Sequence, residues 1–221
     1  MFDQVAHAGE ATEAPIFAPA FQAELETLFR WRRDVRHFRR DPLPTGLLDR
    51  LLEIANASPS VGLSQPWRFV TIDDPARRAA VRADFEACNA AALTTQEGAR
   101  AASYARLKLA GLERAPCHVA VFVEPDPEQG HGLGRRTMPE AVAYSAVIAV
   151  HTLWLAARAQ GIGLGWVSIL DPSRIRGILD VPETWQLVAY LCIGYPETDA
   201  VVPELEREGW ENRSPINAIA R

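Results

Sequence analysis

The sequence has little cysteine and no excess of positive charge. Its 221 residues include three cysteines and carry a net charge of -5, with a pI near 5.6. An acidic chain lacks the basic face that general nucleic-acid binders present, and three cysteines without a Cys-x-x-Cys pair do not form a disulfide framework. We therefore expect a reduced, cytoplasmic protein that does not bind nucleic acid.

The chain also lacks a targeting segment, an interdomain linker and an internal repeat. Residues 1–19 have neither a basic start nor an apolar block, so we predict a flexible N-terminal tail there. The long uncharged run, residues 141–157, is short for a bilayer span, and we expect no membrane association. An apolar content of 48% is enough for one core, which predicts a single domain over residues 20–221.

The uncharged run is predicted to be a central helix that begins at Pro139-Glu140 and stops at Gly161. A helix that is apolar on nearly every face is buried on all sides, and in a chain of this size that indicates packing between two subunits. His151 lies on this helix without a second His, Cys or carboxylate at metal-ligand spacing. We interpret it as a core histidine and predict no metal site.

An arginine-rich segment, residues 32–38, reads Arg-Arg-Asp-Val-Arg-His-Phe and follows a predicted helix over residues 21–32. Three guanidinium groups lie within five positions there. Guanidinium groups form paired, charge-assisted hydrogen bonds with phosphate oxygens, so the segment is a candidate anion site. Considered alone, such a run is more typical of a solvated helix end.

A second candidate is the loop over residues 57–67, Ala-Ser-Pro-Ser-Val-Gly-Leu-Ser-Gln-Pro-Trp, between a predicted helix at 45–56 and a strand at 67–72. It has short hydroxyl side chains, two stiffening prolines and Gly62, where the backbone can approach a ligand. By itself it is typical of an ordinary connection. Together with the arginines it becomes a candidate for holding a planar polar ring.

The glycines of residues 161–165 are in the wrong order for a dinucleotide fingerprint, because they follow a helix and lead into a strand. We expect them to permit a close turn. Ser168 then lies at the strand end, where its hydroxyl can meet a ligand. It lacks the Gly-x-Ser-x-Gly context of a nucleophile.

Alanine-rich helices are predicted over residues 74–92 and 95–112, and residues 85–112 are a candidate lid or, alternatively, part of the scaffold. Further elements are expected as strands at 117–124 and 185–194 and a helix at 171–180. Arg135 and Arg136 are either substrate-facing or solvated. Arg213 could reach back to the anion site or extend into solvent.

Four motifs, in order over residues 30–215, carry a family resemblance: Arg-Arg-Asp-Val-Arg-x-Phe, Ser-Pro-Ser-Val-Gly-x-x-Gln-Pro-Trp, Thr-Met-Pro-Glu and Gly-x-Gly-x-Gly-Trp-Val-Ser-Ile. The chain resembles the nitroreductase-like flavoproteins and, more narrowly, the 5,6-dimethylbenzimidazole synthases among them. Asp34, where nitroreductases usually have a small hydroxyl residue, and the Trp-Val-Ser-Ile segment point to the synthase branch. The resemblance implies an α+β sandwich with a central, mostly antiparallel sheet flanked by helices, in a homodimer with FMN between the subunits.

The resemblance also implies roles for individual residues. In this family reduced FMN is the substrate: dioxygen converts it to 5,6-dimethylbenzimidazole, the lower ligand of vitamin B12, and erythrose 4-phosphate. Asp34 and Ser168 would be catalytic. The implied FMN-binding residues are Arg32, Arg33 and Arg36 at the phosphate, Arg213 as a further phosphate candidate, and Ser58, Pro59, Ser60 and Gln65 along the flavin.

The chemistry of two of these residues fits such a reaction. Among arginines the pKa of Asp34 is expected to fall, which leaves a carboxylate able to accept a proton; alternatively, Asp34 only aligns the arginines. Ser168 can donate and accept hydrogen bonds at the ring edge. The sequence shows no nicotinamide signature, so reduced FMN would come from a separate flavin reductase or form without an enzyme.

Two rival functions remain open at this point. One is a conventional nitroreductase or flavin reductase that retains FMN and uses NAD(P)H. The other is a non-catalytic flavin-binding protein. They differ from the synthase in whether the flavin survives turnover.

Overall fold

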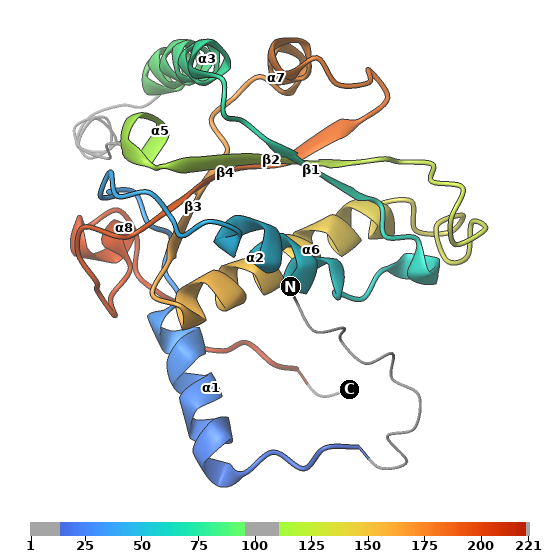
Figure 1. The fold of residues 1–221 in the computed structure, drawn as a ribbon, viewed down its shortest axis with the longest axis vertical. Coiled ribbons are helices and arrows are strands. Elements are labelled where there is room, and N and C mark those ends of the chain that lie inside the picture. The colour runs from blue at the N-terminus through green and yellow to red at the C-terminus, as the bar shows by residue number, and fades with distance from the viewer. Residues whose placement is uncertain (1–13, 96–110, 220–221) are drawn as a thin grey trace.

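The computed structural model describes residues 14–95 and 111–219 and shows an antiparallel four-stranded sheet between two layers of helices (Figure 1). The strand order is β1-β2-β4-β3, and each neighbouring pair is antiparallel. The strands are β1 (Trp67–Thr71), β2 (Cys117–Val123), β3 (Gly163–Val167) and β4 (Gln186–Gly194). The predicted α+β architecture with an antiparallel sheet is thus confirmed.

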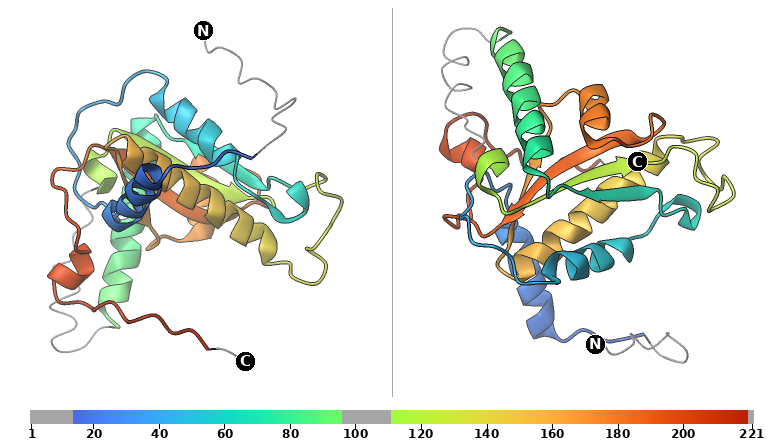
Figure 2. Two further views of the ribbon diagram at one scale, coloured as in Figure 1. Left: turned by 90° about the horizontal axis from the view of Figure 1, so that it is seen from below. Right: turned by 45° about the horizontal axis from the view of Figure 1, so that its top comes forward.

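The two faces of the sheet bury separate cores because successive strand side chains point in opposite directions. On β2, Val119 and Val121 belong to one apolar cluster, and Ala120 and Phe122 belong to the other. Figures 1 and 2 show helices α2 and α6 over the first face and α3 and α7 over the second. Their bounds are α2 Leu47–Asn56, α6 Ala141–Ala159, α3 Pro75–Leu93 and α7 Pro172–Leu179.

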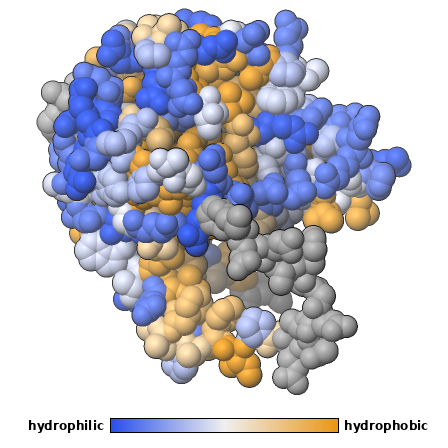
Figure 3. Space-filling view, in the orientation of Figure 1, coloured by the Kyte–Doolittle hydropathy of each residue, from blue (hydrophilic) through white to orange (hydrophobic). Residues whose placement is uncertain are grey.

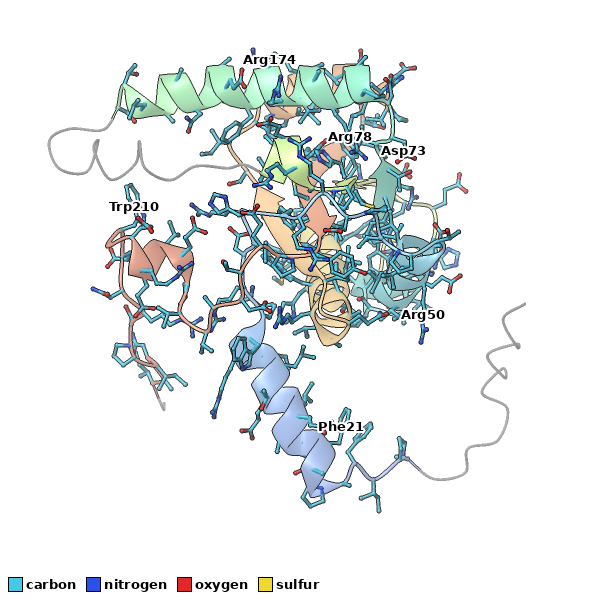
Figure 4. All side chains as sticks on the ribbon, turned by 60° about the vertical axis from the view of Figure 1, so that its left-hand side comes forward. Phe21, Arg50, Asp73, Arg78, Arg174 and Trp210 are labelled. Atoms are coloured by element: carbon cyan, nitrogen blue, oxygen red, sulfur yellow. The ribbon has the colours of Figure 1, made fainter. Side chains whose placement is uncertain are left out.

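Helix α1 (Pro19–Trp31) projects from this body, and none of its residues is buried. Figure 3 shows apolar side chains along it, and Figure 4 shows Phe21 near the end that lies far from the sheet. The helix ends beside the C-terminal end of α6, where Arg158 lies over the Trp31 ring. The arginines that follow α1 therefore lie at this end of α6. Shorter helical turns are η1 (Val61–Leu63), α5 (Gly111–Arg114) and α8 (Glu204–Arg207).

Helix α6 is buried on one side only within a single chain. Tyr144, Val147 and Ile148 are exposed by 55%, 40% and 44%, and His151 is exposed as well. The prediction that His151 is a core residue is therefore wrong, because it lies on the side of the helix away from the sheet. By length and composition alone α6 could cross a membrane, a test that core helices of soluble proteins also pass. Here its buried side packs against the sheet: Val142, Ser145, Ala146, Ala149, Val150, Leu153 and Ala157.

The candidate lid, residues 85–112, falls largely outside the described residues. Its start belongs to α3, which is anchored to α7. The buried carboxylate of Asp84 accepts a hydrogen bond from the Asp171 amide at 2.8 Å and lies 2.9 Å from Arg174 Nε (Figure 4 labels Arg174). A lid function remains a prediction.

The arginine segment crosses β3 at very short range. Val35 N donates to Leu164 O at 3.0 Å, and Asp34 forms a parallel bridge with Leu164. A Cβ on Gly165 would lie 2.1 Å from Val35 O, and one on Gly163 would lie 2.8 Å from the Val35 side chain. The glycines of β3 are therefore needed for this close approach.

Gly165→Ala should destabilise the protein by about 1–3 kcal/mol, because the added methyl group would push the arginine segment off β3. Urea denaturation would measure the change. Gly177→Ala is the matched control: it lies in α7 with nothing within 4 Å of a Cβ, so it should be neutral or stabilising by up to about 1 kcal/mol. Equal stabilities for the two variants would contradict the proposed packing.

Stability should fall in acid because of a buried histidine. His118 Nδ1 lies 2.9 Å from the Tyr190 hydroxyl, and burial, helped by the charge of Arg78, lowers the pKa of His118 from 6.5 to about 4. The unfolded chain binds this proton below pH 6.5 and the folded chain only below about pH 4, so this contribution is lost as the pH falls between those values. Urea denaturation at pH 7 and pH 4.5 should show a loss on the order of 2 kcal/mol. His118→Gln should flatten this dependence, and the exposed His131→Gln should not.

Candidate functional site

The arginine segment is held between α6 and the C-terminal segment. The Arg32 guanidinium lies over the Trp154 ring, 4.7 Å from its centroid. Trp154 Nε1 donates to Arg33 O at 3.1 Å, and Arg33 Nε donates to Val201 O at 2.5 Å. Elements far apart in the sequence therefore fix the direction of both arginines.

The guanidinium groups of Arg32, Arg33 and Arg213 lie close enough to repel one another. Burial lowers the pKa of Arg32, Asp34 opposes this, and the charge of Arg213 lowers it further. Burial, Arg213 and Arg32 lower the pKa of Arg33, against an opposing contribution from Glu206. Arg213 thus lies within electrostatic reach of the cluster instead of extending away from it. A gathering of partly buried cations is stabilised by a bound anion, which suits a phosphate group.

Arg36 has a different partner from Arg32 and Arg33. Its side chain is 12% exposed, and Arg36 Nε lies 3.5 Å from Asp34 Oδ2. This ion pair holds the carboxylate of Asp34 beside the guanidinium group of Arg36. Arg36 can therefore act on a ligand directly or through Asp34.

Asp34 is attached to β3 through its side chain. Asp34 Oδ1 accepts a hydrogen bond from the Trp166 amide at 2.9 Å. Burial raises the pKa of this carboxyl and outweighs the lowering by the Trp166 amide and Arg36, while the charge of Glu204 raises it further. The expectation that neighbouring arginines lower the pKa of Asp34 is therefore wrong, because desolvation dominates. About 39% of the side chain remains exposed.

Ser168 follows the last residue of β3 and is exposed. It lies two residues beyond the Trp166 amide that binds Asp34. The hydroxyl and the carboxyl are thus positioned by the same strand, and Ser168 lies at the strand end, as the sequence predicted.

The loop of residues 58–65 is fixed against α6 and closed on itself. Ser58 Oγ donates to Thr152 Oγ1 at 2.7 Å. Ser60 Oγ accepts from the Gln65 amide at 3.0 Å, and Gln65 Nε2 donates to Asn56 O at 3.1 Å. Pro59 is exposed. These contacts order the loop.

Gly62 packs against the neighbouring loop of residues 130–133. Its φ is +58°, and a Cβ would lie 2.9 Å from Leu133 O and 3.1 Å from Gly130 O. The expectation that Gly62 allows a ligand to approach is not supported here, because the 130–133 backbone occupies that space. Arg135 braces the same region through Asp126 and Pro127 O, both within 2.6 Å, whereas Arg136 is exposed.

The structure brings together one half of the candidate site within a single chain. The arginines and Asp34 gather around β3 and the C-terminal end of α6, and Ser168 follows the opposite end of β3. The loop of residues 58–65 runs along α6 from Thr152, which Ser58 contacts, to Ser145, which the Val61 amide contacts, toward the N-terminal end of the helix (Figure 1). Between the two groups, no hydrogen bond or ion pair is found among the described residues.

Two residues were not singled out by the sequence. His37 and Glu204 line a small cavity with Asp34, and His37 Nε2 lies 3.8 Å from Glu204 Oε1. His37 belongs to the arginine run and could have been noticed there. Glu204 gives no local signal, because it reaches the site from α8. No group of three potential metal ligands occurs in the described part of the chain.

Comparison with known proteins shows relatives that match most of the chain. The model of the Nitroreductase family matches residues 29–195. The chain is 56% identical over 207 residues to a 5,6-dimethylbenzimidazole synthase of Rhodospirillum rubrum, covering 94% of this chain and 98% of the relative. A 5,6-dimethylbenzimidazole synthase of Rhodobacter capsulatus is 48% identical over 199 residues, with 90% and 96% coverage.

Solved structures share the fold. An oxidised iodotyrosine deiodinase bound to FMN and 3-iodo-L-tyrosine superposes with a TM-score of 0.69 at 23% identity, covering 89% of this chain and 97% of that one. At that identity the likeness concerns the fold alone. The arrangement of sheet and helices described above is thus one on which an FMN site is known.

Proposed function

The chain belongs to the nitroreductase family, and from this we propose that it is a 5,6-dimethylbenzimidazole synthase. It consumes reduced FMN and dioxygen and yields 5,6-dimethylbenzimidazole, the lower ligand of vitamin B12, and erythrose 4-phosphate. The observation that carries this proposal is the 56% identity to a named synthase over nearly the whole of both chains. The Asp34 carboxyl, held by the Trp166 amide of β3, is the structural feature that supports it.

The residues present fit the phosphate of FMN. Arg32, Arg33 and Arg213 concentrate positive charge: burial and the charge of Arg213 lower the pKa values of Arg32 and Arg33, and Asp34 and Glu206 offset this only in part. A phosphate monoester supplies that charge and accepts several hydrogen bonds. FMN, when bound in reduced form, supplies the electrons for dioxygen.

Asp34 is the proton acceptor in this proposal. The Trp166 amide fixes Oδ1, and Oδ2 faces Arg36, so the carboxyl has one defined orientation. Its raised pKa makes it a better base than an ordinary carboxylate. It takes a proton from a ribityl hydroxyl or a ring position, and Ser168 holds the ring edge through its hydroxyl.

The second half of the site comes from another copy of the chain. Within one chain no hydrogen bond or ion pair among the described residues joins Ser58, Pro59, Ser60 or Gln65 to the arginines, so in this proposal a second subunit completes the site. The exposed apolar side of α6 offers a surface for this homodimer. The three cysteines are free, which fits a reduced, cytoplasmic protein, and a separate flavin reductase would supply reduced FMN.

The deciding experiment is incubation of the purified protein with chemically reduced FMN in air, followed by mass analysis of small products. The proposal requires 5,6-dimethylbenzimidazole and erythrose 4-phosphate in equal amounts with loss of flavin. Flavin that survives many turnovers with NAD(P)H would show a conventional reductase instead. Flavin that is bound and recovered unchanged in air would show a binding protein.

A further inference from the structure

A small cavity lies between residues 33–37 and the C-terminal segment that carries α8. Its volume is about 40 Å³, which is room for one or a few water molecules. Its lining combines Val35, Thr198, Ala200 and Val202 with charged side chains, and the charged groups offer water hydrogen-bonding partners. The ionisable side chains that line it are Arg33, Asp34, Arg36, His37, Glu204 and Arg207.

Glu204 interacts with both His37 and Asp34. Its Oε1 lies 3.8 Å from His37 Nε2, and its charge acts on the carboxyl of Asp34. The side chain of Glu204 is 18% exposed and that of His37 is 41% exposed, so the pair leads from the cavity to the surface. Three guanidinium groups around the cavity disfavour a free hydronium ion. A proton that leaves this way therefore needs a carboxylate to carry it.

We propose that Glu204 and His37 form a proton relay, through water in this cavity, between Asp34 and solvent. This proposal rests on the proposed function, in which Asp34 accepts protons from the substrate. That reaction turns a ribityl hydroxyl into an aldehyde and closes an aromatic ring, so protons leave at more than one step. A single carboxylate covered by ligand cannot take them all unless it is emptied during the turnover.

The transfer is balanced and involves no electrons. Asp34 gives its proton to a cavity water, and the same water passes a proton to the Glu204 carboxylate. A second water bridges the 3.8 Å between Glu204 Oε1 and His37 Nε2, so Glu204 passes the proton through it to Nε2 of His37, and His37 releases one from Nδ1 to solvent. Proton exchange of the exposed ring with solvent then restores the starting tautomer. Asp34 returns to the carboxylate form, ready for the next step.

The first test is Glu204→Gln, which keeps the size of the side chain but cannot carry the proton. With reduced FMN bound and dioxygen added, single-turnover formation of 5,6-dimethylbenzimidazole should slow by about 10-fold or more, and the solvent deuterium isotope effect should rise. FMN affinity should stay within about twofold. The matched control is Glu208→Gln, an exposed residue at the end of the same helix, which should behave as the unaltered protein.

The second test is chemical rescue of His37→Ala. Its single-turnover rate should fall and should be restored by added imidazole, which should not restore Glu204→Gln. Full rates in both variants, or slow rates with neither an isotope effect nor imidazole rescue, would overturn the relay. No product from the unaltered protein would instead contradict the proposed function itself.

Discussion

Asp34→Asn should reduce formation of 5,6-dimethylbenzimidazole by about 100-fold or more while FMN stays bound. The amide oxygen of asparagine can still accept the Trp166 hydrogen bond, so the backbone arrangement is kept. What is lost is the group that accepts a proton, a role that contributes roughly 100- to 10,000-fold in enzymes. Single-turnover product analysis with reduced FMN in air would measure the loss, and flavin fluorescence would measure binding.

The matched control is Asp41→Asn. Asp41 is exposed and pairs with Arg39 at 2.8 Å, outside the site, so its loss should leave product formation unchanged. If Asp34→Asn formed product at the ordinary rate, Asp34 would have no catalytic role. Loss of FMN binding together with product would indicate instead that Asp34 only aligns Arg36 and the other arginines.

Arg32→Gln should weaken FMN binding by about 10- to 100-fold, the effect of losing one charge-assisted hydrogen bond, about 1.4–2.7 kcal/mol. Arg32 is held over Trp154 and lies within electrostatic reach of Arg213, so its removal takes one of three charges from the anion site. Fluorescence titration with FMN and with riboflavin separates the cause. Riboflavin has no phosphate, and its affinity should change little.

Arg30→Gln provides the control for this prediction. Arg30 precedes the cluster on α1, is exposed and pairs with Glu26 on the same helix. Its substitution should leave FMN affinity unchanged. An equal loss of affinity for FMN and riboflavin in Arg32→Gln would argue against a phosphate contact by this side chain.

The sequence by itself determined the elements and the chemistry of the candidate residues. Helix starts such as Asp74-Pro75 and Asp171-Pro172 are encoded locally, because a side-chain oxygen caps the first amides and proline suits the first turn. The alternation of core residues along β2 is encoded in the same local way. The order of four motifs was enough to identify the family, because together they are specific although each is short.

Only the tertiary structure decided which of these residues meet. Arg213 approaches Arg32 through folding of the C-terminal segment, and Glu204 reaches Asp34 from α8 in the same way. No local pattern encodes such contacts, because they depend on the packing of segments more than 160 residues apart.

The tertiary structure also reversed two expectations. Burial raises the pKa of Asp34 although arginines flank it in the sequence, because the cost of desolvating a carboxylate depends on everything packed around it. His151 is exposed because α6 lies with its other side against the sheet, and hydrophobicity all round a helix does not say which side packs within the chain. Composition thus determined that α6 has apolar faces to cover, and the fold decided which of them a single chain covers.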